Sequence, residues 1–448
     1  MRTPLVLARV ALISMALFLS ACVGSDNATL LAGSTVAPTE SSNSPWVTVW
    51  SWAPMGLVTA NFLNTGRIPG QPLPVPVVLN DTTLRMVIKP TAGGEVFRLK
   101  LSNIFGDSAL VVEQVHVGIH AGNGEVKAGT NRLVTFNQGQ QALSMAQNDY
   151  LSDPFNLQVS FGEELAVTLF LKGPHHGTLT GHLETNQEAY IAPGSTAELA
   201  SAESSSQFPL RWVSSAYLSE LQVQNSDQRG VLVVVGDSIT DGTGSEINSN
   251  SRWSDVLAKR LATAEEPVAV QSIANMGIGA NRLLSDPNFP LTALFNSGPG
   301  LLKRMDRDVL GVNRVSHVIV LIGTNDIGIP PGTTAAELIA GYRQLLGRLK
   351  ARGIKAYIAT LLPSGIRQLP FRAPLIHFSA EAKALRDEVN QWIRTQNEFD
   401  GVIDFAKCVE DPDRPGYMRA EYDSGDGLHP NSNGYKAMGD FIPLELLR

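Results

Sequence analysis

The stretch that decides the fold is VLVVVGDSITDG, residues 231–242, in which five apolar residues run directly into Gly236, Asp237 and Ser238. An uninterrupted apolar run of this length is typical of a strand that is buried on both faces, as in a parallel sheet covered by helices. In open α/β folds, ligands bind at the carboxyl edge of the sheet. The sequence therefore predicts that the Ser238 hydroxyl lies at a functional edge.

Three further segments carry polar residues of the same kind, and each accompanies a predicted element. Two of them follow apolar, strand-like runs, and the third leads into a predicted helix. They are NMGIGANR (residues 275–282), GTND (residues 323–326) and DGLHP (residues 426–430). Because the carboxyl ends of parallel strands meet at one edge of a sheet, we expect these loops to gather around Ser238.

The residue types in these loops suit nucleophilic catalysis. A serine hydroxyl is a poor nucleophile unless a base takes its proton. His429 would take the proton from Ser238 during attack on a carbonyl and return it to the leaving group. Asp426 would bond the other imidazole nitrogen and stabilise the imidazolium. The Ser238 N–H, a backbone N–H of the second segment and the Asn325 amide would bind the negative oxygen of the tetrahedral intermediate.

Three of these blocks resemble those of the SGNH hydrolase superfamily, also called GDSL-type esterases and lipases: GDSI (residues 236–239), GTND and DGLHP. The resemblance covers about residue 231 to the C-terminus. It is closest to a bacterial secreted subgroup with a β-rich domain before the catalytic one. It implies an α/β, flavodoxin-like hydrolase domain and a catalytic triad of Ser238, Asp426 and His429.

The second block departs from the family pattern at one position. The family usually has GIGGNR, whereas residues 277–282 read GIGANR, with Ala280 in place of glycine. The donor expected there is a backbone N–H, which alanine also has. Alanine is expected to be tolerated only at negative φ, because positive φ penalises a Cβ. We therefore expect an oxyanion hole of Ser238, Ala280 and Asn325, with a negative φ at Ala280.

Each block taken alone is more often structural than catalytic. GDS after a strand is commonly a turn or a helix cap, and GTND is commonly a turn, because Asn and Asp bond to their own backbone. Asp423 also lies three residues before Asp426 and is a candidate surface carboxylate. All blocks together, in this order, favour catalysis. The rival hypothesis is a non-catalytic, glycan-binding surface lipoprotein with a vestigial hydrolase domain, and only Ala280 favours it.

Other chemistries find no support in the sequence. Residues 236–240 do not match the Gly-x-Ser-x-Gly elbow of α/β-hydrolases. Residues 277–279 lack the third glycine of a dinucleotide-binding loop. The eight histidines show no metal-ligand spacing, and serine chemistry needs no metal. We therefore expect no cofactor and no metal.

The N-terminus resembles a lipoprotein signal peptide, residues 1–22. Arg2 and Arg9 precede an apolar run, residues 10–19, that is too short to span a membrane. LSAC at its end resembles a bacterial lipoprotein box, in which Cys22 is acylated; the alternative is an ordinary secretory signal. The expected location is the bacterial cell envelope, at the outer membrane or the periplasmic face if the organism is Gram-negative. The lipid alone would attach the protein to the membrane.

Composition divides the rest of the chain. Residues 23–45 are rich in Ser, Thr, Ala and Gly and are typical of a flexible tether. Residues 46–227 show strand patterns, which predict a β-sandwich or jelly-roll-like domain, with residues 196–206 as a surface loop. In residues 228–448 strands alternate with helices, which predicts a doubly wound parallel sheet. The expected helices there are residues 254–264, residues 334–349 after a Thr334–Glu337 capping box, and residues 379–394.

The net charge of −7 argues against a nucleic-acid surface. Apart from Cys22, the only cysteine is Cys408, which we expect to be a packed thiol. The predicted activity is that of a serine ester hydrolase acting through an acyl-enzyme on short-acyl carboxylic esters, with O-acetyl groups of polysaccharides among the candidate substrates. The β-rich domain would be a substrate-side wall, a glycan-binding module or a structural partner. The acyl length, the alcohol half and the oligomeric state stay open.

Overall fold

The computed structural model describes residues 44–58, 79–175, 177–225, 227, 229–286, 298–329, 332–365 and 376–448. The signal peptide with Cys22 and nearly all of the tether lie outside the described residues. The described residues belong to one compact unit. Within it, strand pairing changes from antiparallel to parallel between Gln224 and Gly230, next to the expected boundary at residue 227.

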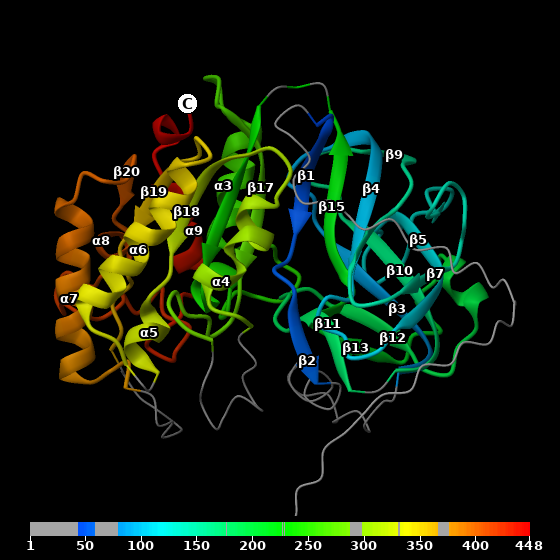
Figure 1. The fold of residues 1–448 in the computed structure, drawn as a ribbon, viewed down its shortest axis with the longest axis horizontal. Coiled ribbons are helices and arrows are strands. Elements are labelled where there is room, and N and C mark those ends of the chain that lie inside the picture. Colours follow the sequence, from blue (N-terminus) through cyan, green and yellow to red (C-terminus); the bar gives the residue numbers. More distant parts are fainter. Residues whose placement is uncertain are drawn as a thin grey trace, which may run out of the picture. The chain divides into compact units, whose positions relative to one another are not determined.

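The carboxyl-terminal region is built on a parallel sheet of five strands in the order β17-β16-β18-β19-β20 (Figure 1). These are β16 (Gly230–Gly236), β17 (Val270–Gly277), β18 (Val315–Leu321), β19 (Lys355–Ala359) and β20 (Gly401–Ile403). Alternate residues of β16 enter different cores. Leu232 and Val234 pack with one group of helices, whereas Val231, Val233 and Val235 pack with another. Both faces of β16 are covered, which is why all five residues are apolar.

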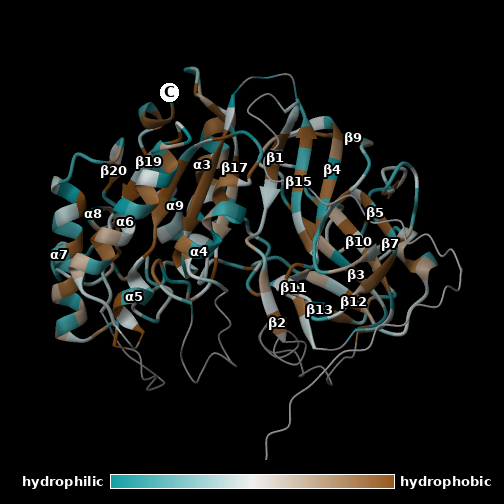
Figure 2. Ribbon diagram, in the orientation of Figure 1, coloured by the Kyte–Doolittle hydropathy of each residue, from teal (hydrophilic) through white to brown (hydrophobic). Residues whose placement is uncertain are grey.

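The helices divide between the two faces accordingly. One face packs against α3 (Trp253–Ala262), α8 (Phe405–Val409) and α9 (Ser432–Phe441). The other packs against α4 (Leu301–Met305), α6 (Ala335–Lys350) and α7 (Ala380–Thr395). The expected capping box is present, because Thr334 Oγ1 accepts a hydrogen bond from the Glu337 N–H and Glu337 Oε2 accepts one from the Thr334 N–H. Figure 2 shows the sheet as mostly hydrophobic between these amphipathic helices.

Antiparallel sheets make up the amino-terminal region. One contains β1 (Trp46–Ser51), β15 (Leu218–Gln224), β4 (Gly94–Ser102), β8 (Asp149–Leu151) and β9 (Phe155–Val159). A second contains β13 (Leu210–Trp212), β12 (Ala189–Ala192), β3 (Leu79–Ile88), β10 (Leu165–His175), β5 (Leu110–Ile119), β6 (Arg132–Val134) and β7 (Leu143–Met145). A third contains β14 (Ser215–Ala216), β11 (Thr178–His182) and β2 (Met55–Val58). The region is therefore β-rich, and a sandwich or jelly-roll arrangement stays a prediction.

The expectation of a surface loop at residues 196–206 was partly wrong. Residues Ala197–Ser201 form a short 3₁₀ helix, and its Leu199 and Ala200 are buried. Leu199 packs with Val87, Tyr190 and Phe208 in a small apolar cluster. The Ser- and Ala-rich composition concealed this helix, because a single leucine holds it to the sheet.

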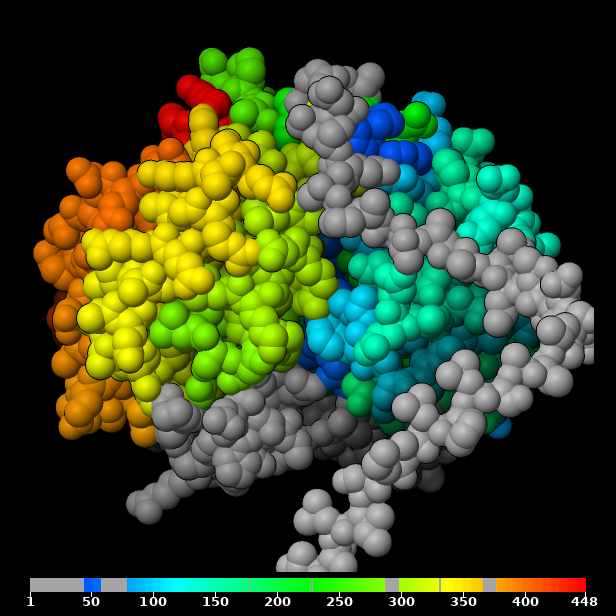
Figure 3. Space-filling model, in the orientation of Figure 1, coloured from blue at the N-terminus to red at the C-terminus, as the bar shows by residue number. Residues whose placement is uncertain are grey.

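The two regions meet directly (Figure 3). Strand β1 packs along β17, and Ser272 Oγ donates a 2.7 Å hydrogen bond to the Thr48 carbonyl. Thr91 Oγ1 donates to the Ile273 carbonyl at 3.1 Å and accepts from the Ile273 N–H at 3.0 Å. The larger apolar core runs through both regions without a break. The β-rich region is therefore packed against the strand that precedes one of the loops of interest.

Candidate active site

Ser238 occupies the first position of a short helix, α2 (Ser238–Asp241), directly after β16. Asp237 caps this helix, with its carboxylate accepting a 3.0 Å hydrogen bond from the Ile239 N–H. Burial raises the pKa of Asp237 to about 7. Gly236 is required at the turn, because a Cβ there would lie 2.1 Å from Thr240 Oγ1. The strand thus ends in a close turn that leaves Ser238 partly exposed.

The structure places the three predicted triad residues in line. His429 Nε2 lies 2.8 Å from Ser238 Oγ, and His429 Nδ1 lies 2.6 Å from Asp426 Oδ2. The other oxygen of Asp426 accepts hydrogen bonds from the Leu428 and His429 N–H groups, each at 2.8 Å. The carboxylate is therefore held by its own loop and aims at the imidazole.

The electrostatics of the pair fit a general base. Burial by itself would lower the pKa of His429, but the hydrogen bond and charge of Asp426 outweigh it and the pKa is raised. The pKa of Asp426 moves well below its usual range; burial opposes this, but the hydrogen bond to His429 and that residue's charge dominate. Asp426 thus stays ionised beside an imidazole whose proton affinity is increased.

Asp423, the alternative carboxylate, has a different position. Its Oδ1 accepts hydrogen bonds from the Gly425 N–H at 2.8 Å and the Gly427 N–H at 3.0 Å. Both glycines have positive φ, at 105° and 75°. Asp423 therefore shapes the loop, whereas Asp426 contacts His429.

Ala280 has a φ of +57°, so the expectation of a negative φ was wrong. The loop turns here through the left-handed region, which disfavours residues with a Cβ. On one side of Ala280, the Gly279 N–H donates to Asp241 Oδ2 at 2.9 Å, and on the other the Asn281 N–H donates to the Ile278 carbonyl at 3.1 Å. Among the described residues, the Ala280 N–H has no protein acceptor.

Asn325 is the second residue of a short helix, α5 (Thr324–Gly328), which follows β18. Its Nδ2 donates a 3.1 Å hydrogen bond to the Asn281 carbonyl, which links it to the Ala280 loop. Its Oδ1 faces His377 Nε2 at 3.2 Å. Asp326, the next residue, accepts from the Leu283 N–H at 2.8 Å and the Leu284 N–H at 3.0 Å. GTND therefore fixes the loop of the second segment as well as presenting Asn325.

Three residues near the site were not anticipated from the sequence: His182, Glu184 and His377. His182 and Glu184 come from the β-rich region. Glu184 Oε2 accepts a 2.5 Å hydrogen bond from Thr243 Oγ1, and its charge helps to raise the pKa of His429. None of these three residues belongs to a recognisable sequence motif. Only the tertiary fold brings them close to the loops that carry the predicted site residues.

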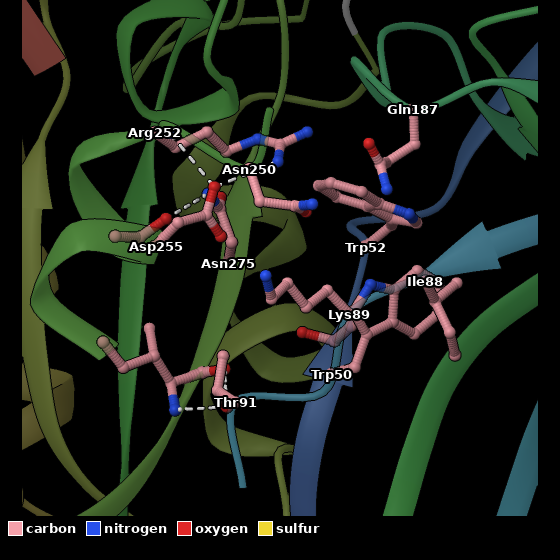
Figure 4. A pocket seen from close by; sticks show the side chains of 13 residues that line it. Trp50, Trp52, Ile88, Lys89, Thr91, Gln187, Asn250, Arg252, Asp255 and Asn275 are labelled. Atoms are coloured by element: carbon pink, nitrogen blue, oxygen red, sulfur yellow. Dashed lines mark hydrogen bonds and ion pairs between the residues drawn. The ribbon is translucent and has the colours of Figure 1, made fainter. Parts of the chain in front are cut away.

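The described part of the chain contains two cavities of note. One, of about 30 Å³, lies between the regions beside Trp50, Trp52 and Arg252, and has room for about one water (Figure 4). The other, of about 430 Å³, is lined by Arg282, Asp326 and polar residues around α6. No member of the predicted triad lines either cavity.

Within the described ranges, no cluster of three or more His, Cys, Asp or Glu residues could hold a metal ion. Searching the same ranges finds no helix that is long and apolar enough to cross a membrane. Cys408 is partly buried, and burial raises its pKa to about 11, which leaves it mainly as the unreactive thiol.

Comparison with known proteins gives a family match for part of the chain. Residues 234–437 match the model of the GDSL-like lipase/acylhydrolase family. This range includes Ser238, Ala280, Asn325, Asp426 and His429. No curated protein matches the chain.

Solved structures that are similar to about half of the chain include three esterases or lipases. The carbohydrate acetylesterase Est24 from Sinorhizobium meliloti is 17% identical, with a TM-score of 0.37, over 47% of this chain and 95% of that one. The aryl esterase of M. smegmatis is 16% identical, with a TM-score of 0.36 and the same coverage. A GDSL-like lipase from Bacteroides thetaiotaomicron is 18% identical, with a TM-score of 0.34, over 48% and 87%. Likenesses of this size do not bear on the substrate.

Proposed function

We propose that this chain, whose residues 234–437 match the model of the GDSL-like lipase/acylhydrolase family, is a serine hydrolase of short-acyl carboxylic esters. The observation that carries this proposal is the unbroken line of hydrogen-bonding distances from Ser238 through His429 to Asp426, 2.8 and 2.6 Å. A nucleophile, a base within reach of its proton and a carboxylate that orients the base are the parts that acyl transfer requires.

In the proposed reaction, Ser238 Oγ attacks the ester carbonyl while His429 Nε2 takes the hydroxyl proton. The negative oxygen that forms is bound by the Ser238 and Ala280 N–H groups and by Asn325 Nδ2. Collapse of the intermediate breaks the bond to the alcohol, which leaves with the proton from His429, and an acyl-enzyme remains. Water then attacks in the same way and releases the acid. Asp426 stabilises the imidazolium in both halves.

We propose a polar alcohol half, with O-acetylated carbohydrate as the candidate class. Among the described residues, the exposed large apolar side chains are Val111, Leu133, Phe161, Ile376 and Phe441. None lies on the loops that carry the proposed triad and oxyanion residues, and Ile376 alone is next to a residue that contacts them, His377. Glu184 adds a carboxyl group close to His429; burial and the charge of Asp241 raise its pKa. A carboxyl group accepts hydrogen bonds from hydroxyl groups in either protonation state. These features suit a hydroxyl-bearing substrate better than a lipid surface.

The location and the role of the β-rich region are also proposals. A lipid on Cys22 would attach the protein to a bacterial envelope, with residues 23–45 as the tether. Support for this comes from the signal-like residues 1–22 alone. For the β-rich region, whose antiparallel sheets we propose to be a sandwich or jelly roll, Glu184 supports a place in the substrate-side wall.

Ester hydrolysis by the purified protein tests the function. The substrates are p-nitrophenyl acetate, butyrate and octanoate, and the comparison is Ser238→Ala. We expect turnover that is fastest on acetate and that falls by about 10⁴-fold or more in the variant. Near-background rates on all three esters and on an acetylated polysaccharide, together with glycan binding that survives Ser238→Ala, would instead support the non-catalytic binder.

A further inference from the structure

His182, in the β-rich region, contacts the short helix α2 of the catalytic region. It ends strand β11, and its side chain is 1% exposed. Nδ1 lies 3.0 Å from the Ala53 carbonyl, and Nε2 lies 2.8 Å from Asp241 Oδ1. A carbonyl and a carboxylate both accept hydrogen bonds. Both ring nitrogens therefore face acceptors, which suits the doubly protonated, cationic imidazole.

Asp241 connects this cation to the two loops of the proposed reaction. It is the last residue of α2, the helix that begins at Ser238, so it lies one turn from the nucleophile. Its second oxygen, Oδ2, accepts the 2.9 Å hydrogen bond from the Gly279 N–H. Gly279 directly precedes Ala280. A Cβ at Gly277 would lie 2.4 Å from the Asp241 N atom, so the loop presses against α2 here.

Side chains of both regions hold the pair in place. Trp52 stacks on His182, with ring centroids 4.9 Å apart and planes at 11°. Arg252 lies 4.8 Å from the centre of the Trp52 ring (Figure 4). Its Nε donates a 2.7 Å hydrogen bond to the Asp241 carbonyl. The Asp241 carboxylate is itself only 1% exposed, and a buried carboxylate needs a partner that carries positive charge.

Ala280 gives an independent reason why this support is needed. A residue with a Cβ persists at a φ of +57° only when its surroundings determine the conformation. The residue before it is fixed by the Asp241 carboxylate, and that carboxylate is fixed by His182. We propose that His182 is a positioning residue, which acts through Asp241 to hold the Gly279–Ala280 loop in the conformation that aims the Ala280 N–H at the oxyanion.

This inference rests on the proposed function for its effect on rate. The negative oxygen exists in the transition state and not in the bound ester. A loop that is no longer held therefore lowers kcat and leaves KM nearly unchanged. A residue that served only to join the two regions would lower stability without this kinetic signature.

The test compares His182→Phe and His182→Gln in the full chain, with Thr91→Val as the matched control. Phenylalanine keeps a ring over Trp52 but cannot donate to Asp241, whereas glutamine can still donate through its amide. Thr91→Val removes a partly buried contact between the same two regions, at Ile273, away from Asp241. The readouts are kcat and KM on p-nitrophenyl acetate and hydrogen exchange of a peptide that covers residues 277–282.

For His182→Phe we expect kcat to fall about 10- to 100-fold, with KM changed less than about threefold and faster exchange in residues 277–282. Glutamine should restore part of kcat, and Thr91→Val should leave the kinetics and this peptide unchanged. Unchanged exchange in His182→Phe, or an equal loss of kcat in Thr91→Val, would overturn the inference. If the parent protein hydrolyses no ester, the proposed function fails, and the exchange comparison still decides whether His182 holds the loop.

Discussion

His377 Nε2 donates a hydrogen bond to Oδ1 of Asn325 across 3.2 Å, and this bond sets which end of the amide faces the nucleophile loops. Burial lowers the pKa of His377 to about 4, so the ring is neutral at pH 7 and carries a single N–H. That proton lies on Nε2, because Oδ1 can only accept. Gly328 leaves room for the ring, since a Cβ there would lie 1.9 Å from His377 Cδ2.

Replacing His377 should therefore impair the oxyanion hole indirectly. In His377→Leu, the Asn325 amide loses the bond that fixes its direction, and we expect kcat to fall by about tenfold with KM nearly unchanged. Direct removal of the donor in Asn325→Ala should cost about 10²–10³ in kcat. Steady-state kinetics on p-nitrophenyl acetate measures both. A larger loss in His377→Leu than in Asn325→Ala would contradict this order.

The pH dependence should report the His429–Asp426 pair. Only neutral His429 can take a proton, so kcat/KM should rise with pH and level off above the pKa of His429, which Asp426 raises above 6.5 despite burial. Asp426→Asn removes the negative charge, so the pH range over which kcat/KM rises should move to lower pH. At the same time kcat should fall by about 10⁴-fold. A pH–rate profile of both proteins measures the shift. A limb that stays in place would exclude His429 as the titrating base.

Glu184, which belongs to the β-rich region, should also affect the pH at which kcat/KM rises. Its charge contributes to the raised pKa of His429, after the larger contribution of Asp426. Glu184→Gln should therefore lower the pKa of His429 and move the acidic limb to lower pH, by less than Asp426→Asn does. Glu95→Gln, at an exposed position of β4, is the control. Equal profiles for Glu184→Gln and the parent would mean that this carboxylate does not act on the imidazole.

Ala280 should be a source of instability. Glycine adopts the left-handed region without a Cβ penalty of about 1–2 kcal/mol but loses more entropy on folding. We expect Ala280→Gly to raise the free energy of unfolding by about 0.5–1 kcal/mol, and Ala280→Val to lower it. Urea unfolding measures both. A destabilised glycine variant would show that the alanine methyl makes contacts worth more than the backbone strain.

Arg304 should be the strongest single polar support of the loops. It is 2% exposed, and its guanidinium donates to Asp308 Oδ2, to Asn281 Oδ1 and to the carbonyls of Met276 and Gly236. Arg304→Met leaves these acceptors buried and should cost about 3 kcal/mol of unfolding free energy. Arg343→Met breaks an exposed pair with Glu398 and should cost less than about 1 kcal/mol. Similar losses in the two variants would contradict the assignment.

Local chemistry explains which features the sequence could predict. The strand of residues 231–235 is recognisable because both of its faces are buried, and the capping box at Thr334 because its bonds lie within one turn. Asp426 and His429 lie three residues apart, so one loop sets their geometry. Ser238 and His429 lie beside each other although 191 residues separate them. Their proximity follows from the sheet topology, which gathers these loops at one edge.

Features that depend on tertiary contacts could not be predicted in this way. His182 meets Asp241 across 59 residues and His377 meets Asn325 across 52, and no spacing pattern announces either pair. The predicted sign of the Ala280 φ angle was wrong for the same reason. The residue before Ala280 donates a hydrogen bond to Asp241, a tertiary contact that the preference of alanine does not reveal.

The contact between Thr91 and Ile273 has a consequence for the behaviour of the catalytic part by itself. In the part of the chain that the structure describes, strand β17 is the outermost strand of the parallel sheet, and its far side has no neighbouring strand within that sheet. Thr91 occupies the Ile273 N–H and C=O there, and β1 packs alongside. Cut away from residues 46–224, the sheet would offer an open row of backbone groups to the next copy of itself. By covering this edge, the β-rich region would prevent the parallel sheets of two copies from pairing.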